Sequence, residues 1–136
     1  MIRRMDHFTI VSDQLDKTLA FYTMLGLSSG PRPDFGVPGF WFYAGDHPVL
    51  HVLGVDKMPE PRRGTLDHMA FWAEGLIETV ERLREYRVRF SMIRTPRPYS
   101  TWQVFFDDPN GAEVELDFDA AERAPADWKA YVGRSR

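Results

Sequence analysis

Three of the four histidines of this chain, together with one glutamate, occupy matching places in two copies of one sequence pattern. Each copy opens with an Asp-His pair, which ends at His7 in the first copy and at His68 in the second, 61 positions later. Near the end of the copies, His51 corresponds to Glu115 at an offset of 64 positions. Imidazole and carboxylate groups bind Fe, Mn, Ni, Co or Zn as divalent ions. The duplication therefore predicts a divalent metal site built from His7, His51, His68 and Glu115.

Strand alternation puts these four residues on one predicted face of the sheet, because successive side chains of a strand point to opposite faces. The alternating rows are apolar and suited to packing under helices: Phe8 and Ile10, Leu50 and Val52, Met69 and Phe71, Val114 and Leu116. The opposite face is then a polar concavity, which fits a binding site better than a core. Taken singly, each histidine could be a surface or hydrogen-bonded residue, and Glu115 could belong to an exposed acidic strand face. His47 has no repeat partner and lies beside a proline, so we expect it in an exposed turn.

The elements that must position these residues follow from hydrophobic periodicity. Strands are predicted near 5–11, 40–44, 48–54, 66–72, 101–106 and 112–118, with weaker strands near 28–34 and 88–95. Helices are predicted near 13–25 and 75–86, the first with Ser12 or Asp13 as its N-cap and Gly26 after its end. The Asp-Asp-Pro-Asn-Gly string at 107–111 predicts a turn between two strands.

We expect two half-domains in the 136 residues, because a unit of about 60 residues alone is only marginally stable. The first module spans 1–58 and the second 64–118, and residues 56–64 read as the linker between them. Residues 119–136 form an extension outside the repeat. It is predicted to hold a short helix around Trp128 and Tyr131 that covers the sheet or a neighbouring subunit.

The composition, 43% hydrophobic and 27% charged residues, is that of a soluble globular protein. No apolar run approaches the roughly 20 residues of a membrane span, so no membrane partner is expected. A net charge of −3 without a basic face argues against nucleic acid. The chain has no cysteine, which excludes disulfides and thiolate metal sites. The basic first residues precede no signal-peptide core, and we expect a cytoplasmic protein.

The repeated pattern resembles the vicinal oxygen chelate superfamily, the group of glyoxalases, bleomycin-resistance proteins and extradiol dioxygenases. The resemblance covers residues 5–118, and the segment from Asp107 to Leu116 is its most specific part. The other residues that carry it are Asp6-His7, Phe21-Tyr22, Leu25-Gly26-Leu27 and Asp67-His68. The resemblance implies an α+β fold of two repeated βαβββ modules, whose curved mixed sheets enclose a metal site. The ligands that it implies are His7, His68 and Glu115, with His51 in a fourth position where glyoxalase I enzymes usually carry Glu.

The resemblance further implies a metal-dependent enzyme whose small-molecule substrate chelates the ion through vicinal oxygens. Glyoxalase-like lyase or isomerase chemistry and Fe(II) dioxygenase chemistry both stay open. His51 differs in charge from the usual Glu, and the other three ligands match the two-His-one-carboxylate set of dioxygenases. Glu115 and His51 are the candidate catalytic groups. The alternative is a non-catalytic protein that sequesters a drug or metabolite, although bleomycin-resistance proteins of that kind usually lack the metal ligands.

Four residues are candidate substrate contacts: Gln103, Arg97, Trp72 and Tyr43. Aromatic residues that could wall the pocket are Phe35, Trp41, Tyr43, Trp72, Tyr99 and Trp102. The alternative is that these aromatic side chains are plain core and that Arg97 is simply solvated. We also expect a homodimer, since two-fold pairing is the commonest way for a soluble protein to cover sheet edges and apolar surface.

Overall fold

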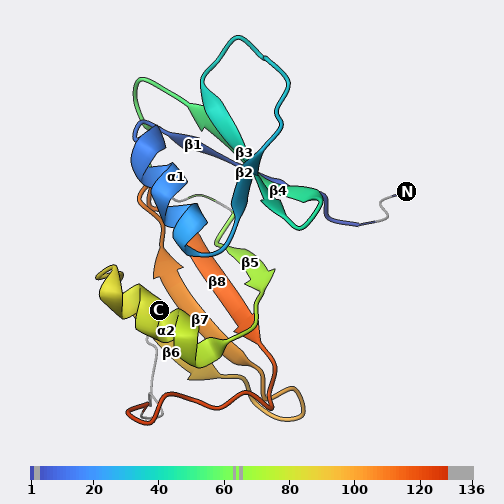
Figure 1. The fold of residues 1–136 in the computed structure, drawn as a ribbon, viewed down its shortest axis with the longest axis vertical. Coiled ribbons are helices and arrows are strands. Elements are labelled where there is room, and N and C mark those ends of the chain that lie inside the picture. Colours follow the sequence, from blue (N-terminus) through green and yellow to red (C-terminus); the bar gives the residue numbers. More distant parts are fainter. Residues whose placement is uncertain (2–3, 63, 65, 129–136) are drawn as a thin grey trace. The chain divides into compact units, whose positions relative to one another are not determined.

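The computed structural model describes residues 1, 4–62, 64 and 66–128, which contain two four-stranded mixed sheets and two helices (Figure 1). The chain divides into two compact units. Unit 1 comprises Met1–Leu66 and Asp108–Ala112. Unit 2 comprises Asp67–Asp107 and the chain from Glu113 onward. The element order is βαβββ twice over. The predicted α+β fold of two βαβββ modules is therefore confirmed.

Unit 1 contains the first five elements of the chain. They are β1 (Phe8–Ser12), α1 (Leu15–Met24), β2 (Ser28–Gly30), β3 (Gly39–Ala44) and β4 (His47–Gly54). The strand order is β1-β4-β3-β2, in which β1 runs parallel to β4 and the other pairs are antiparallel.

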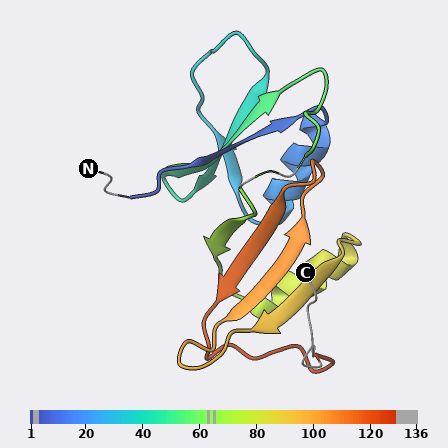
Figure 2. The same cartoon turned by 180° about the vertical axis from the view of Figure 1, so that it is seen from behind.

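Unit 2 repeats this architecture, and Figure 2 shows it from behind. Its elements are β5 (Met69–Trp72), α2 (Leu76–Glu85), β6 (Phe90–Arg94), β7 (Trp102–Asp107) and β8 (Glu113–Phe118). The order β5-β8-β7-β6 again has one parallel pair, β5 with β8. Both sheets thus follow the same plan, as an internal duplication requires.

The core of unit 1 lies between its sheet and α1. Tyr22 of α1 meets Phe42 of β3 with a ring separation of 5.4 Å, and both side chains are fully buried. Phe42 pairs with the buried Leu50, so this row faces the helix. The adjacent pair, Trp41 with His51, must point to the other face. The separation of apolar and candidate-ligand rows that alternation predicts is therefore present.

Two local predictions are wrong. The N-cap of α1 is Gln14, because β1 continues through Ser12, whose buried hydroxyl accepts a hydrogen bond from the Gln14 N–H at 3.0 Å. His47 is the first residue of β4 and not part of an exposed turn. Its side chain is half-buried, and its Nε2 donates to the carbonyl oxygen of Asp6 at 2.9 Å. Gly26 follows the helix with φ +98°, as predicted.

Trp128, the last described residue of the extension, contacts β6 and β7 of the second sheet and is not in a helix. The Trp128 N–H donates to the Pro125 oxygen at 2.9 Å in a turn. Its ring meets that of Trp102 edge-on at 4.8 Å. Tyr131 lies outside the described residues. Among those residues, no helix has the length and apolar character that crossing a membrane requires.

Candidate functional site

His7 and His51 stack on the face of the unit 1 sheet that points away from α1. Their ring centroids are 3.8 Å apart and the ring planes differ by 22°. Thr9 pairs with His51 in the parallel β1–β4 register, so His7, two residues earlier, belongs to the same row. His7 Nδ1 donates a hydrogen bond to Asp6 Oδ2 at 3.0 Å. This bond leaves Nε2 as the nitrogen whose lone pair can bind a metal ion.

His51 carries a buried nitrogen that has no hydrogen-bond partner in the described part of the chain. Trp41 from β3 stacks on the His51 ring at 4.1 Å with the planes only 4° apart. Burial, and then the nearby His7, lowers the pKa of His51, which favours the neutral imidazole at pH 7. Among the described residues, none forms a hydrogen bond with the shielded Nε2. A buried polar atom without a partner costs free energy, so a metal ion or a substrate proton would stabilise this nitrogen by binding to it.

Unit 2 holds an equivalent pair, His68 and Glu115. His68 Nδ1 donates to Asp67 Oδ2 at 2.9 Å, and His68 Nε2 lies 2.9 Å from Glu115 Oε2. Ala70 pairs with Glu115 in the parallel β5–β8 register, just as Thr9 pairs with His51. Each unit therefore presents an imidazole oriented by the preceding aspartate, next to a second donor at the same position of its sheet.

Glu115 is a buried carboxylate in an acidic environment. The residue is 5% exposed, and burial raises its pKa, with Asp117 adding to the effect and His68 opposing it. Gln103 Nε2 donates hydrogen bonds to Glu115 Oε1 and, at 3.0 Å, to Asp117 Oδ1. A buried carboxylate with a second carboxylate nearby gains stability from a bound cation.

The donor set in the two units fits a divalent metal ion. Neutral imidazole and carboxylate are ligands for first-row metals, and His7 and His68 each have the outer carboxylate that commonly orients metal-binding histidines. Within the described ranges, no three His, Cys, Asp or Glu side chains form a cluster that could hold a metal. Each pair by itself supplies fewer than the three or four protein ligands of a typical site.

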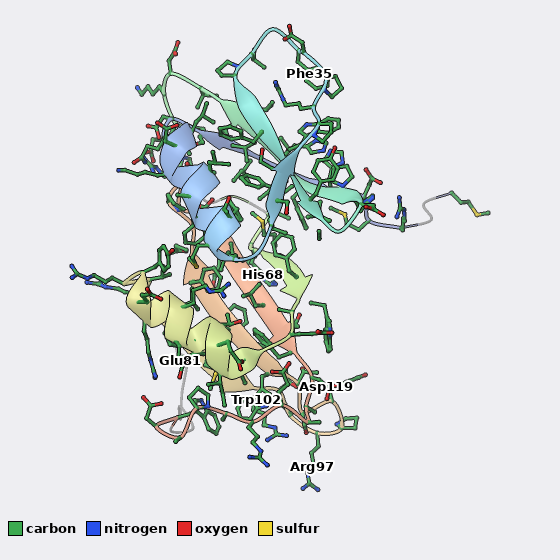
Figure 3. The ribbon with its side chains drawn as sticks, in the orientation of Figure 1. Phe35, His68, Glu81, Arg97, Trp102 and Asp119 are labelled. Carbon is green, nitrogen blue, oxygen red and sulfur yellow. The ribbon has the colours of Figure 1, made fainter. Side chains whose placement is uncertain are left out.

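The predicted substrate contacts take different positions. Gln103 lies against Glu115, and Trp72, which is 64% exposed, shares the row of His68 and pairs with Asp117. The Tyr43 hydroxyl donates to the Pro31 oxygen at 2.7 Å. Arg97 is exposed in the turn between β6 and β7, and Figure 3 places it at the opposite end of unit 2 from His68.

The aromatic residues that were predicted to line the pocket also lie in different environments. Trp41 contacts a candidate ligand directly, and Phe35 lies 6.1 Å from Trp41, measured between ring centroids. Trp102 is not a wall residue, because it is 2% exposed and its indole N–H donates to the Glu122 oxygen. Tyr99 is exposed in the same turn as Arg97.

Sequence reasoning missed the role of the two aspartates that precede the histidines. Asp6 and Asp67 each accept a hydrogen bond from the next residue's Nδ1. The signal was present, since the Asp-His dipeptide itself is duplicated. It also missed Phe105, a buried ring that meets His68 edge-on at 6.1 Å and pairs with Glu115.

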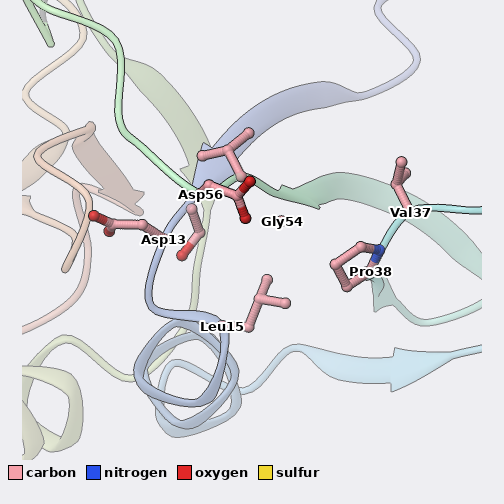
Figure 4. Close-up of a pocket in the computed structure, with 8 residues that line it drawn as sticks. Asp13, Leu15, Val37, Pro38, Gly54 and Asp56 are labelled. Carbon is pink, nitrogen blue, oxygen red and sulfur yellow. The ribbon is translucent and has the colours of Figure 1, made fainter.

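A separate hollow of about 510 Å³ opens in unit 1 near the ends of β1 and β4 (Figure 4). Its lining residues are Ser12, Asp13, Leu15, Val37, Pro38, Gly54, Val55 and Asp56. None of the candidate metal ligands belongs to this lining, so the hollow is distinct from the His7–His51 pair.

Comparison with known proteins agrees with the fold and the repeat. The family model "Glyoxalase/Bleomycin resistance protein/Dioxygenase superfamily" matches residues 4–116. No curated protein gives a significant match. A solved glyoxalase/dioxygenase from Nostoc punctiforme is 23% identical, with a TM-score of 0.68, and the alignment covers 86% of this chain and 91% of that chain. The fosfomycin resistance protein FosX from Listeria monocytogenes is 21% identical, with a TM-score of 0.67, and the alignment covers 86% of this chain and 92% of that chain.

These likenesses are to the fold, while the family assignment rests on the sequence match across most of the chain. The duplicated βαβββ units and the family match lead to one conclusion. The chain belongs to the glyoxalase, bleomycin resistance protein and dioxygenase superfamily.

Proposed function

We propose that this protein is a metal-dependent enzyme whose divalent ion takes His7, His68 and Glu115 as ligands. His51 serves as the fourth ligand or as a base beside the ion. The observation that carries the proposal is the equivalence of the two donor pairs. In each unit an aspartate-oriented imidazole adjoins a second donor at the same sheet position.

The substrate class follows from the donor set. A small molecule with adjacent oxygens would bind at positions that the protein ligands leave open, where a bound divalent ion supplies Lewis acidity to those oxygens. The side chains perform the remaining tasks. Asp6 and Asp67 hold the imidazole tautomers, and Gln103 fixes the Glu115 carboxylate through the hydrogen bond to Oε1.

His51 is the group best suited to move a proton. Its lowered pKa favours the neutral form, and its Nε2 has no partner among the described residues. A neutral imidazole with a free lone pair can accept a proton from a substrate carbon or hydroxyl. This supports lyase or isomerase chemistry, with dioxygenase chemistry as the second reading because two histidines and one carboxylate also suit Fe(II).

An activity panel tests the proposal. Protein loaded anaerobically with Fe(II), and separately with Mn(II), Co(II), Ni(II) or Zn(II), is assayed on a hemithioacetal, on catechols with oxygen, and on fosfomycin. We expect metal-dependent turnover in one arm and its loss in His51→Ala. If a probe binds but no arm shows turnover with any metal, the result favours a sequestering protein of the bleomycin-resistance kind.

A further inference from the structure

The His7–His51 pair is one end of a longer series of contacts within unit 1. Trp41 stacks on His51, and Phe35 lies 6.1 Å from Trp41. The guanidinium carbon of Arg32 in turn lies over the Phe35 ring, 5.1 Å from its centroid. Arg32 and Phe35 both belong to the loop between β2 and β3, in which Figure 3 labels Phe35. A cation therefore stands at the far end of an aromatic path that leads to the candidate ligands.

The loop holds this guanidinium in a defined position. Arg32 Nη2 donates to the Val37 oxygen at 3.0 Å, and the Tyr43 hydroxyl holds the Pro31 oxygen next to it. Prolines on both sides of Arg32 restrict the backbone further. The positioning of the charge therefore costs little additional entropy when a ligand arrives.

The charge of Arg32 has no counter-ion in the described part of the chain. No described carboxylate lies within ion-pair distance, and Asp34, two residues away, accepts the Gly36 N–H instead at 2.8 Å. Arg32 Nε is shielded from water and lacks an acceptor among the described residues. The Arg32 charge also helps to lower the pKa of His51, although burial and then the nearby His7 are the larger causes. Among the described residues, the Arg32 guanidinium therefore has no anionic acceptor.

We infer that Arg32 recognises an anionic group, a carboxylate or a phosphate, on the small molecule that binds over the His7–His51–Trp41 face. The guanidinium fork suits the planar or tetrahedral oxygens of such groups. The Trp41 and Phe35 rings lie between the anion site and the histidines, where they can pack against the body of the ligand. The inference rests on the proposed function for the ligand's position, and it narrows the substrate class to anionic molecules.

The test uses the full chain without added metal, so its outcome is independent of metal binding. Succinate and inorganic phosphate are titrated into ¹⁵N-labelled protein while the Nε–H signals of arginine and the indole N–H signals are followed by NMR. Neutral succinamide is the control probe. Arg32→Gln removes the charge, and Arg32→Lys keeps the charge without the fork. Arg89→Gln is the matched control, since Arg89 is an exposed loop arginine of unit 2.

We expect saturable shifts of the Arg32 Nε–H and Trp41 indole signals with succinate or phosphate and none with succinamide. Arg32→Gln should weaken the anion's affinity at least about tenfold, Arg32→Lys less, and Arg89→Gln not at all. Unchanged backbone spectra establish that the variants are folded. Equal affinity in the wild type and Arg32→Gln, or no saturable shift with either anion, would overturn the inference. Neither result would bear on the metal site.

Discussion

A carboxylate next to His7 and another next to His68 determine which ring nitrogen is available for a metal ion. Asp6 and Asp67 accept hydrogen bonds from Nδ1 of His7 and His68, at 3.0 and 2.9 Å. The bond from His7 also lowers the pKa of Asp6, which keeps its carboxylate ionised near neutrality. With the proton on Nδ1, Nε2 is the nitrogen that can offer its lone pair to a metal ion, and the ring cannot rotate freely.

Removing these carboxylates should therefore weaken metal binding without unfolding the protein. We expect Asp6→Ala and Asp67→Ala each to lower the affinity for Mn(II) or Co(II) by about 10–100-fold. Isothermal titration calorimetry measures the change. Asp46→Ala, an exposed turn residue, is the control. Wild-type affinity in both site variants would show that the aspartates do not orient metal ligands.

A substitution at Glu115 should distinguish a metal-binding role of this residue from a structural role. Its raised pKa means that the buried ionised form destabilises the metal-free fold at pH 7. Glu115→Gln should therefore lower metal affinity by more than about 100-fold, beyond the usual effect of a residue that only orients a ligand. Without metal, the same variant should be at least as resistant to urea as the wild-type protein. Glu81→Gln on the exposed face of α2 (Figure 3) should change neither quantity. A Glu115 variant that loses stability but keeps its metal affinity would contradict the assignment.

Residue order was sufficient to propose the candidate metal ligands but not the hydrogen-bond partners of their side chains. Repeat symmetry and strand alternation were sufficient to select His7, His51, His68 and Glu115, because both depend on residue order alone. The hydrogen bond from Gln103 to Glu115 depends on the antiparallel β7–β8 register. Residue order cannot give that register, so this hydrogen bond could not be predicted from the sequence.

At the scale of elements, the turn between β7 and β8 does more than connect two strands. Its residues Asp108 and Asn110 are buried, and they bond to α1 of unit 1. The Tyr22 hydroxyl donates to Asp108 Oδ2 at 2.9 Å, and Asn110 Nδ2 donates to Thr18 Oγ1 at 3.0 Å. The turn was predicted from Asn-Gly, but these bonds join residues 86 and 92 positions apart. Local pattern contains no information about contacts at that range.

The Tyr22 hydroxyl should therefore contribute measurably to stability. Tyr22→Phe leaves Asp108 with one fewer buried donor, and we expect the free energy of unfolding to fall by about 1.5–3 kcal/mol. Urea denaturation followed by circular dichroism measures the loss. Tyr99→Phe, at a side chain that is 78% exposed, should have no effect. Equal stability of the two variants would mean that the buried bond contributes nothing net.

The same contact predicts a dependence on alkaline pH. Burial, and then the Asp108 charge, raises the pKa of Tyr22 well above that of an exposed phenol. Because the unfolded chain then loses this proton at lower pH than the folded chain, the stability from this group is complete below about pH 10 and falls as pH rises beyond it. In urea melts from pH 8 to 11, Tyr22→Phe should show a shallower loss of stability than the wild type. Parallel slopes would contradict the prediction.

The order and type of the elements could be predicted from periodicity, including the short strands β2 and β6. Their ends could not, and the shift of the α1 N-cap to Gln14 is an example. Ser12 has the residue type of an N-cap, but its pairing with Gly54 extends β1 by one residue. Tertiary pairing therefore overrides a local capping preference.

At the scale of the whole molecule, exposed strand edges suggest self-association. β1 and β2 are the outer strands of one sheet, and β5 and β6 those of the other. Leu66, which precedes β5 in the sequence, and Trp72, the last residue of β5, add apolar surface with 66% and 64% exposure. We propose a homodimer, the commonest arrangement that covers such surface. Light scattering at micromolar concentration should give twice the 15.8 kDa chain mass. A monomeric mass at all concentrations would rule the dimer out.

Mixing variants would establish whether one chain or two complete the metal site. Chains carrying His7→Ala are unfolded and refolded together with chains carrying Glu115→Ala. If the two donor pairs come from different chains of a dimer, mixing restores about one intact site per heterodimer, and metal binding returns. If both pairs come from the same chain, every site in the mixture lacks one ligand, and binding stays weak.

The metal content of the protein tests the central claim most directly. Protein purified without chelator, then exposed to Mn(II), Fe(II), Co(II), Ni(II) or Zn(II) and desalted, is analysed by inductively coupled plasma mass spectrometry. The proposed site predicts one divalent ion per chain for at least one of these metals, with the ion lost in Glu115→Gln and retained in Glu81→Gln. A folded wild-type protein that retains none of the five metals, or a Glu115→Gln variant that retains a full equivalent, would contradict it.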